Sequence, residues 1–160
     1  MNKQIVWTFT NKKQLSKPEF LDYVERKVFR TIRKYNMLPE NRVITIKKSE
    51  NINTQVLKYI IEKKFEVKFS NKTNISQENL SEIAEKIFSE ILKGVFKRHI
   101  PINQPLYYLS DKEIELYAKL TNIKAKSRAK DKRIQLLFEK FMQKNPDLEH
   151  NIINAAAQLK

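Results

Sequence analysis

The sequence contains no cysteine and only one glycine, Gly94, in 160 residues. Without cysteine the chain cannot form disulfides, thiolate nucleophiles or iron–sulfur clusters, and most structural zinc sites are also excluded. A loop that cradles phosphate needs glycines, because successive backbone N–H groups must approach the ligand and some positions need positive φ angles. The apolar pattern places Gly94 in the middle of a helix, so we predict no phosphate-binding loop of this kind.

Other signals of cofactor or membrane binding are also missing. The two histidines, His99 and His150, stand alone in the sequence, which predicts no metal site and no cofactor. No apolar run is long enough to span a membrane, and residues 1–7 lack the apolar region of a signal peptide. We therefore expect a cytoplasmic protein that forms a single domain over residues 1–160, with no membrane partner and no small-molecule substrate.

Positive charge is abundant. The chain has 32 lysines and arginines against 18 acids, a net charge of +14 and a pI near 9.9. Charge of this size favours a polyanionic partner, either nucleic acid or an acidic membrane surface. The cations are concentrated in patches, so the partner is predicted to contact particular parts of the surface.

A basic helix is predicted to begin after Ser16. Ser16 and Glu19 form an S-x-x-E capping box, and Pro18 is tolerated in the first turn because its missing N–H is not needed there. Apolar residues recur three and four apart and predict one buried stripe of Phe20, Val24, Val28, Ile32 and Tyr35. Cations with the same period form a row on another side: Arg26, Lys27, Arg30, Arg33 and Lys34. No acid lies between Arg26 and Arg33 to make the i,i+4 pairs of a solvated face, so we predict that this row binds phosphates.

A strand–helix–strand unit is predicted next. Residues 42–46 are β-branched and apolar, which indicates a buried strand, and residues 53–64 indicate a short helix. Residues 65–69 then alternate as a half-buried strand does. Such a succession forms a right-handed βαβ unit with a parallel pair of strands.

The remaining elements are predicted from the same signals. Residues 5–9 read as a short strand or extended anchor within an N-terminal segment 1–15, and its Trp7 and Phe9 are interpreted as core residues in preference to base-stacking ones. Ser76 is predicted to cap a long helix whose stripe reaches residue 95. Ser110 and Glu113 form a second capping box. Two amphipathic helices close the chain, at 134–142 and 148–159.

Two stretches carry a resemblance to a known family. The first is ERKVFRTIRKYNML at residues 25–38, leading into Arg42 and Val43. The second is PLYYLSDKEIELYA at residues 105–118, which is similar to a P-L-x-x-x-x-x-K-E-x-x-x-Y-A segment. In this order they resemble the archaeal and eukaryotic cytoplasmic tRNA 2-thiolation enzymes of the PP-loop ATP pyrophosphatase superfamily. The resemblance implies a helix-dominated α/β fold, a reduced Rossmann-like (PP-loop ATPase-like) domain with a small parallel sheet.

The sequence departs from that family where the family's chemistry resides. In place of its SGGxDS loop, residues 47–53 read KKSENIN and contain no glycine. Residues 73–79 would match the family's TGHNxDDxA stretch with its acids largely gone, and the family's cysteines are absent. The chain is also roughly half the family's usual length. These departures predict a degenerate, truncated relative that is not an enzyme.

A second basic region lies at residues 119–133, where seven cations face one acid, Asp131. The segment has no apolar face, so it is predicted to be flexible when free and to become ordered against RNA phosphates. A solvated linker is the alternative interpretation.

The preferred function is a non-catalytic structural RNA-binding protein, ribosomal or ribosome-associated, with rRNA as the main partner, tRNA as another, and ribosomal proteins as neighbours. The alternative is an inactive tRNA-binding subunit that partners an active tRNA thiolation enzyme, which an exposed apolar surface for a protein partner would distinguish. An ATP-using enzyme is rejected on the missing glycines and cysteines. The predicted RNA-binding residues are Lys12, Lys13, Arg26, Lys27, Arg30, Arg33, Lys34, Lys47, Lys48, Lys124, Lys126, Arg128, Lys130, Lys132 and Arg133.

Overall fold

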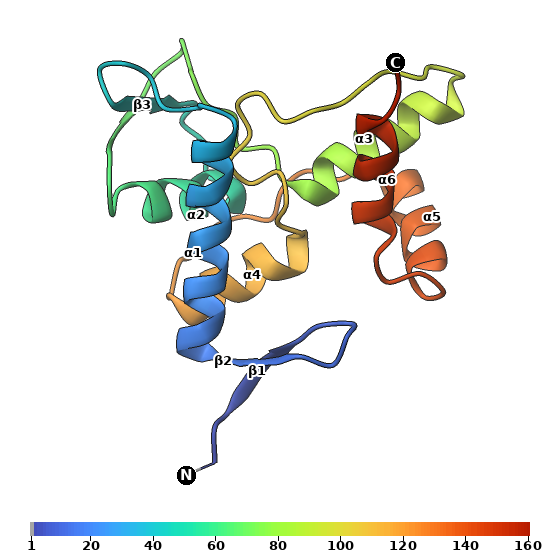
Figure 1. Cartoon of the computed structure of the whole chain (residues 1–160), viewed down its shortest axis with the longest axis horizontal. Coiled ribbons are helices and arrows are strands. Elements are labelled where there is room, and N and C mark those ends of the chain that lie inside the picture. Colours follow the sequence, from blue (N-terminus) through green and yellow to red (C-terminus); the bar gives the residue numbers. More distant parts are fainter. Residues whose placement is uncertain (1) are drawn as a thin grey trace.

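The computed structural model describes residues 2–160 and shows a helix-dominated α/β fold with a small parallel sheet, as predicted. In chain order the elements are β1 (Ile5–Thr8), β2 (Gln14–Ser16), α1 (Lys17–Lys34), β3 (Val43–Ile46), α2 (Ile52–Ile61), β4 (Glu66–Phe69), α3 (Leu80–Leu92), α4 (Asp111–Leu120), α5 (Lys132–Met142) and α6 (Leu148–Ala157) (Figure 1). None of the helices between residues 2 and 160 has the length and apolar character that a membrane span requires.

The parallel sheet is the predicted βαβ unit. Strands β3 and β4 run parallel, with Val43 opposite Glu66 and Ile46 opposite Phe69. Helix α2 connects them and buries its apolar residues, including Val56, Leu57 and Ile60, in the first core. The predicted strand at 42–46, helix at 53–64 and strand at 65–69 are confirmed to within a few residues.

The N-terminal segment forms an antiparallel hairpin of β1 and β2, whose second strand the sequence did not predict. Lys12, with φ of 68°, closes the turn, where the Phe9 N–H donates to the Lys13 carbonyl at 2.8 Å. The Trp7 ring lies 5.4 Å from that of Phe20, and the Phe9 ring lies 5.1 Å from that of Tyr23. The preferred interpretation of Trp7 and Phe9 as packing residues is therefore confirmed.

Both predicted capping boxes form. The Ser16 N–H donates to Glu19 Oε2 at 2.8 Å, and the Ser110 N–H donates to Glu113 Oε1 at 3.1 Å. Each bond satisfies a backbone donor that the helix leaves unpaired, so α1 and α4 begin where the sequence predicts.

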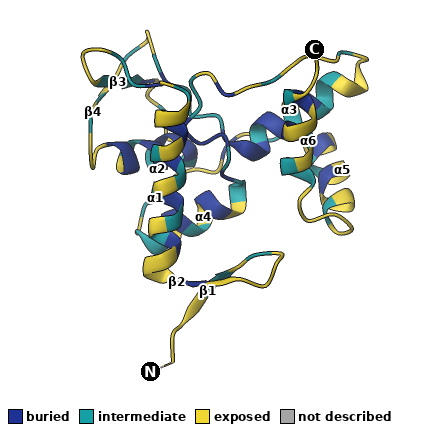
Figure 2. Cartoon of the chain, in the orientation of Figure 1, coloured by how far each residue is buried: buried dark blue, intermediate teal, exposed yellow. Residues whose placement is uncertain are grey.

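Buried residues gather in two cores, and Figure 2 shows dark blue ribbon both in α1, α2 and α4 and in the group of α3, α5 and α6. The first core lies among α1, α2, α4 and β3 and includes Phe20, Ile44, Leu57 and Tyr117. The second lies among α3, α5 and α6, where α3 packs against the other two helices. A backbone bond from the Leu80 N–H to the Leu109 carbonyl, at 3.0 Å, joins the start of α3 to the chain before α4.

Helix α3 differs from its prediction at both ends. Asn79, not Ser76, is the N-cap, and its side chain accepts the Glu82 N–H at 3.1 Å. Gly94 does not lie inside the helix but follows its end with φ of +74°. The Val95 N–H there donates to the Glu90 carbonyl at 2.9 Å, the long bond of a Schellman motif. The glycine therefore serves a positive-φ helix end.

Candidate RNA-binding surface

Near its C-terminal end, helix α1 presents Arg30, Arg33 and Lys34, which are exposed and make no ion pair within residues 2–160. Val24 and Val28 on the opposite face are fully buried in the first core, so the cations are directed to solvent from a fixed helix. Arg26 differs from them, because its Nε lies 2.8 Å from Asp22 Oδ2. Asp22 lies four residues before Arg26 and forms with it an i,i+4 pair, so the prediction that Arg26 has no such partner is wrong.

Lys27 is drawn inward and does not belong to that row. Its Nζ donates to the Tyr23 hydroxyl at 2.7 Å and to the Tyr108 carbonyl at 3.0 Å, and lies 3.8 Å from the buried Glu113. Burial lowers the pKa of Lys27, against the opposing charge of Glu113. Lys27 therefore joins α1 to the start of α4, and its assignment as an RNA contact is corrected.

A second group of cations gathers around the start of α2. Lys47 and Lys48 are exposed just after β3. The Ile52 N–H donates to the Lys126 carbonyl at 2.7 Å, and the Lys126 N–H donates to the Glu50 carbonyl at 3.0 Å, which brings Lys124 and Lys126 alongside. These residues lie beyond the carboxyl end of β3, the edge at which open α/β sheets bind ligands. Lys126 is also paired with Glu50 at 2.7 Å, so Lys124 is its less restrained neighbour.

The same loop does not fit the pyrophosphate that the family resemblance implies. Two N–H groups at the start of α2 already have protein acceptors: Ile52 donates to Lys126, and Asn53 donates to Asn51 Oδ1 at 2.7 Å. No residue from 47 to 53 has a positive φ angle. Backbone donors that are engaged in this way do not form a phosphate cradle.

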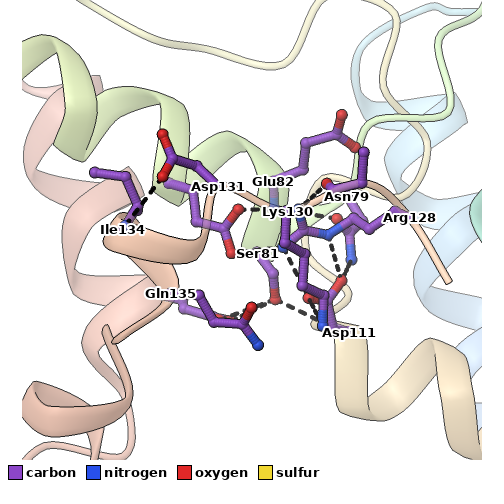
Figure 3. Close-up of polar contacts among 12 residues, drawn as sticks. Asn79, Ser81, Glu82, Asp111, Arg128, Lys130, Asp131, Ile134 and Gln135 are labelled. Carbon is purple, nitrogen blue, oxygen red and sulfur yellow. Dashed lines mark hydrogen bonds and ion pairs between the residues drawn. The ribbon is translucent and has the colours of Figure 1, made fainter. Parts of the chain in front are cut away.

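Arg128 is the centre of a buried ion network (Figure 3). Its guanidinium contacts Asp111 Oδ1 and Oδ2 at 2.8 Å and Glu85 Oε1 and Oε2 at 2.6 and 2.9 Å, and the residue is only 5% exposed. Burial alone would raise the pKa of Asp111, but the hydrogen bonds and charge of Arg128 hold it below its ordinary value. Lys130 is half-buried, 3.5 Å from the same Asp111. The assignment of Arg128 as an RNA contact is therefore wrong, because its charge is neutralised inside the protein.

These contacts also change the interpretation of the basic segment 119–133. Helix α4 continues to Leu120, Lys126 is bonded to the loop before α2, and α5 begins at Lys132. The segment is attached to both cores and is not free. The absence of an apolar face misled the sequence argument, since Arg128 anchors the segment through charge.

A cleft of about 890 Å³ has the opposite charge from the basic surfaces. It lies where the N-terminal hairpin faces α4, α5 and α6, with Trp7 and Phe9 among its walls. Seven carboxylates line it, against the cations Lys112 and Lys130: Glu85, Asp111, Glu113, Glu115, Glu139, Asp147 and Glu149. Burial raises the pKa of Glu149 to about 7, although the Ser81 hydroxyl donates to both its oxygens at 2.9 Å. Glu85 and Asp111 are paired with Arg128, and Glu113 lies beside Lys27. The carboxylates left without such a partner still outnumber Lys112 and Lys130, so we do not assign RNA binding to the cleft.

Most of the predicted RNA-binding residues are exposed. Ten of them are exposed and make no ion pair in the part of the chain that the structure describes; we call them the free cations: Lys12, Lys13, Arg30, Arg33, Lys34, Lys47, Lys48, Lys124, Lys132 and Arg133. Arg42 was not among the predicted RNA-binding residues, although it is exposed, with its guanidinium 5.7 Å from the Phe65 ring centre. It has a φ of 57° in the turn before β3. Its position soon after the basic end of α1 in the sequence is the signal that could have identified it.

Comparison with solved structures finds proteins of similar fold, although the two sequence comparisons find none. No family model matches the sequence, and no curated protein matches it. Among solved structures, the chain is similar to the U34-tRNA thiolase NcsA from Methanococcus maripaludis, with a TM-score of 0.74 and 12% identity. The match covers 96% of this chain and 83% of that chain. The part of the solved thiolase that has no counterpart here is therefore much smaller than the half that the sequence comparison with the family predicted. At this identity the likeness establishes the fold.

The comparison bears on the prediction that the chain is not an enzyme and on whether the chain could bind an iron–sulfur cluster. NcsA is an enzyme, and this likeness contradicts the prediction that the chain is not one. The NcsA structure holds a [4Fe–4S] cluster, a group that cysteine thiolates bind, and this chain has no cysteine with which to hold it. No group of three His, Asp or Glu side chains within residues 2–160 is arranged to bind a metal ion. The likeness confirms the predicted fold: this chain has the helix-dominated α/β fold of the solved tRNA thiolase, with a small parallel sheet.

Proposed function

We propose that this chain binds tRNA in the cytoplasm, through two groups of free cations. One group is the α1 row of Arg30, Arg33 and Lys34, and the other is Lys47, Lys48 and Lys124 near the start of α2. The observation that carries the proposal is that these side chains are exposed and unpaired within residues 2–160, whereas Arg128 and Lys27 are engaged inside the protein.

The mechanism is electrostatic. Residues three and four apart on α1 lie on one face about 5–6 Å apart, so Arg30, Arg33 and Lys34 can contact neighbouring phosphates without rearranging the backbone. Each phosphate that a cation neutralises releases condensed counterions, which makes the affinity fall as salt rises. Phosphate contacts supply affinity and orientation and carry little sequence information.

Two observations favour RNA, and one of them favours tRNA. The net charge of +14 favours a polyanion, and the charge is exposed in defined groups. The solved structure with this fold is described as acting on tRNA at U34. Ribosomal RNA is the second candidate: the small size and high charge of the chain favour it, but the comparison does not.

The test compares two triple variants of the whole chain. In the first, Arg30→Gln/Arg33→Gln/Lys34→Gln removes the α1 row. In the second, Lys58→Gln/Lys63→Gln/Lys68→Gln removes the same amount of charge from lysines paired with Glu62, Glu25 and Glu66. The affinity for unfractionated tRNA and for an rRNA fragment is measured over a range of salt concentrations by fluorescence anisotropy.

We expect the first variant to bind tRNA roughly 10- to 100-fold more weakly and to lose about two to three units of salt slope. The second variant should remain close to wild type, and circular dichroism should show that both variants are folded. The proposal is overturned if both variants weaken binding equally or if neither does. Stronger binding to the rRNA fragment than to tRNA would favour the second candidate.

A further inference from the structure

Helices α3 and α5 leave an apolar face uncovered. Leu92 on α3 is 59% exposed, and Leu137 and Phe141 on α5 are 38% and 50% exposed. None of these side chains is needed to close the second core, which buries Ile87, Ile134 and Phe138 on the inward sides of the same helices. An apolar surface shared by two helices in this way usually marks a contact site.

The exposed residues form one continuous surface. The Phe88 ring centre lies 6.5 Å from that of Phe141, which joins the two helices. Leu92 is one turn after Phe88 and Leu137 is one turn before Phe141, so each lies beside its helical neighbour on the same face. We call this surface, made of Phe88, Leu92, Leu137 and Phe141, the α3–α5 patch.

Cations border the patch along α5. On α5, Lys140 lies three residues after Leu137 and Arg133 lies four residues before it, so both are near the apolar face. Lys144 follows the end of the helix, and its N–H donates to the Phe141 carbonyl at 3.2 Å, which keeps its backbone next to Phe141. All three cations are exposed, and no ion pair involving them occurs among residues 2–160. The acids of these helices face elsewhere: Glu139 lines the acidic cleft, and Glu90 is bonded to His99 at 2.9 Å. The border of the patch is therefore positive and lacks internal compensation.

This border argues against a second copy of the chain as the occupant. A twofold dimer places the same surface on both subunits, so cations would face cations across the interface. A segment with an apolar face and acidic flanks complements both features. An amphipathic helix packs its apolar side on such a surface through anchors three and four residues apart.

We propose that the α3–α5 patch docks an amphipathic helix of another protein, whose apolar side packs on Phe88, Leu92, Leu137 and Phe141 and whose acidic flank pairs with Arg133, Lys140 and Lys144. This proposal goes beyond RNA binding, because it rests on an exposed apolar surface and not on the cations proposed to contact tRNA. It also provides the exposed apolar surface that the alternative of a partner subunit requires.

The test uses a designed peptide of about 20 residues, long enough to form a helix, with leucines on one face and glutamates on both flanks. Its twin carries lysine in place of every glutamate. Binding of each fluorescent peptide is measured to wild-type protein, to Leu137→Ser/Phe141→Ser and to Arg133→Glu/Lys140→Glu. A control, Tyr59→Ser/Phe69→Ser, removes two aromatic side chains of α2 and β4 that are exposed to a similar extent, 41% and 40%.

We expect the acidic peptide to bind wild type and the control equally, and to bind the Leu137/Phe141 variant at least about tenfold more weakly. The Arg133/Lys140 variant should prefer the lysine peptide. The proposal is overturned if the acidic peptide does not bind, or if it binds all four proteins alike. It is also overturned if Leu137→Ser/Phe141→Ser weakens binding to tRNA or to phosphatidylserine vesicles, because the patch would then belong to a nucleic-acid or membrane surface.

Discussion

Arg33 and Arg128 are both arginines in basic stretches, and both were predicted to hold RNA, yet the fold gives them different roles. Arg33 is exposed on α1 and has no acidic partner among the described residues. Arg128 is 5% exposed and bonded to two carboxylates, Asp111 and Glu85. Both arginines add equally to the net charge of the chain, although only Arg33 is available to a phosphate.

The difference lies in how the neighbouring charge is arranged. A buried arginine loses its water contacts and needs hydrogen bonds to fixed carboxylates in their place, so its bonds hold structural elements together. Arg128 links α3, through Glu85, to the start of α4, through Asp111. An exposed arginine on a packed helix retains its hydration and counterions until a polyanion displaces them. The two roles can be separated by experiment.

The largest expected effect comes from Arg128→Met. Its removal leaves Asp111 and Glu85 buried without their main partner, so we expect a loss of about 3–5 kcal/mol in the free energy of unfolding, measured in urea. Adding Asp111→Asn and Glu85→Gln should recover most of that loss, because no uncompensated charge then remains. A loss below about 1 kcal/mol, or no recovery in the triple variant, would show that Arg128 is not structural.

A smaller effect is expected from Glu149→Gln, which removes an acid near the same network. Burial raises the pKa of Glu149 from 4.5 to about 7. The folded state therefore holds a proton that the unfolded state has already released, and the wild type loses stability as pH rises from about 4.5 to about 7. Glutamine removes this loss.

The stability of Glu149→Gln should exceed that of wild type by about 1–3 kcal/mol near pH 8, and the difference should shrink toward pH 4.5. Urea unfolding of both proteins at several pH values measures it. A difference that stays constant with pH would contradict the raised pKa of Glu149, because it would come from packing alone. Asp147→Asn, on an exposed acid of the same cleft, serves as a control.

The smallest effect on the protein itself is expected from Arg33→Gln. Because Arg33 is exposed and unpaired within the described chain, the free energy of unfolding should change by less than about 0.5 kcal/mol. The salt slope for tRNA should fall by about one unit. Lys68→Gln, which removes an exposed lysine paired with Glu66, should change neither quantity. Arg33→Gln and Arg128→Met thus form opposite cases, one expected to affect binding and the other stability.

Features that depend on neighbours in sequence were predictable. The two capping boxes, at Ser16 and Ser110, require only residues three apart, and the parallel pair of β3 and β4 follows from the strand–helix–strand order. The fold class was predicted because residues 25–38 and 105–118 resemble two segments of the tRNA 2-thiolation enzymes and occur in the same order. The likeness to the solved thiolase supports that prediction.

Features that depend on distant contacts were not predictable. The partners of Arg128 lie 17 and 43 residues away in sequence, and the Tyr108 carbonyl that accepts from Lys27 lies 81 residues away. The sequence cannot say which cation turns inward until the fold places a carboxylate or carbonyl within reach. For the same reason the acidic cleft was missed, since its carboxylates come from α3, α4, α5 and α6 and their surroundings.

The predicted ends of α3 were wrong for a local reason. Ser76 and Asn79 are both good N-caps, and the Ser76 hydroxyl instead accepts the Glu78 N–H at 3.3 Å, in the turn before the helix. The apolar stripe continues beyond Leu92, so periodicity alone extended the helix past Gly94, although glycine near a helix end is itself a stop signal.

The most direct test of the account is a lysine footprint of the complete chain. Lysines are acetylated briefly with and without tRNA, and mass spectrometry gives the modification at each position. We expect tRNA to protect Lys34, Lys47, Lys48 and Lys124, and to leave Lys58, Lys68 and the cleft residue Lys112 unchanged. Uniform protection, or protection of the paired and cleft lysines instead, would contradict the claim that tRNA contacts the α1 row and the cations near the start of α2.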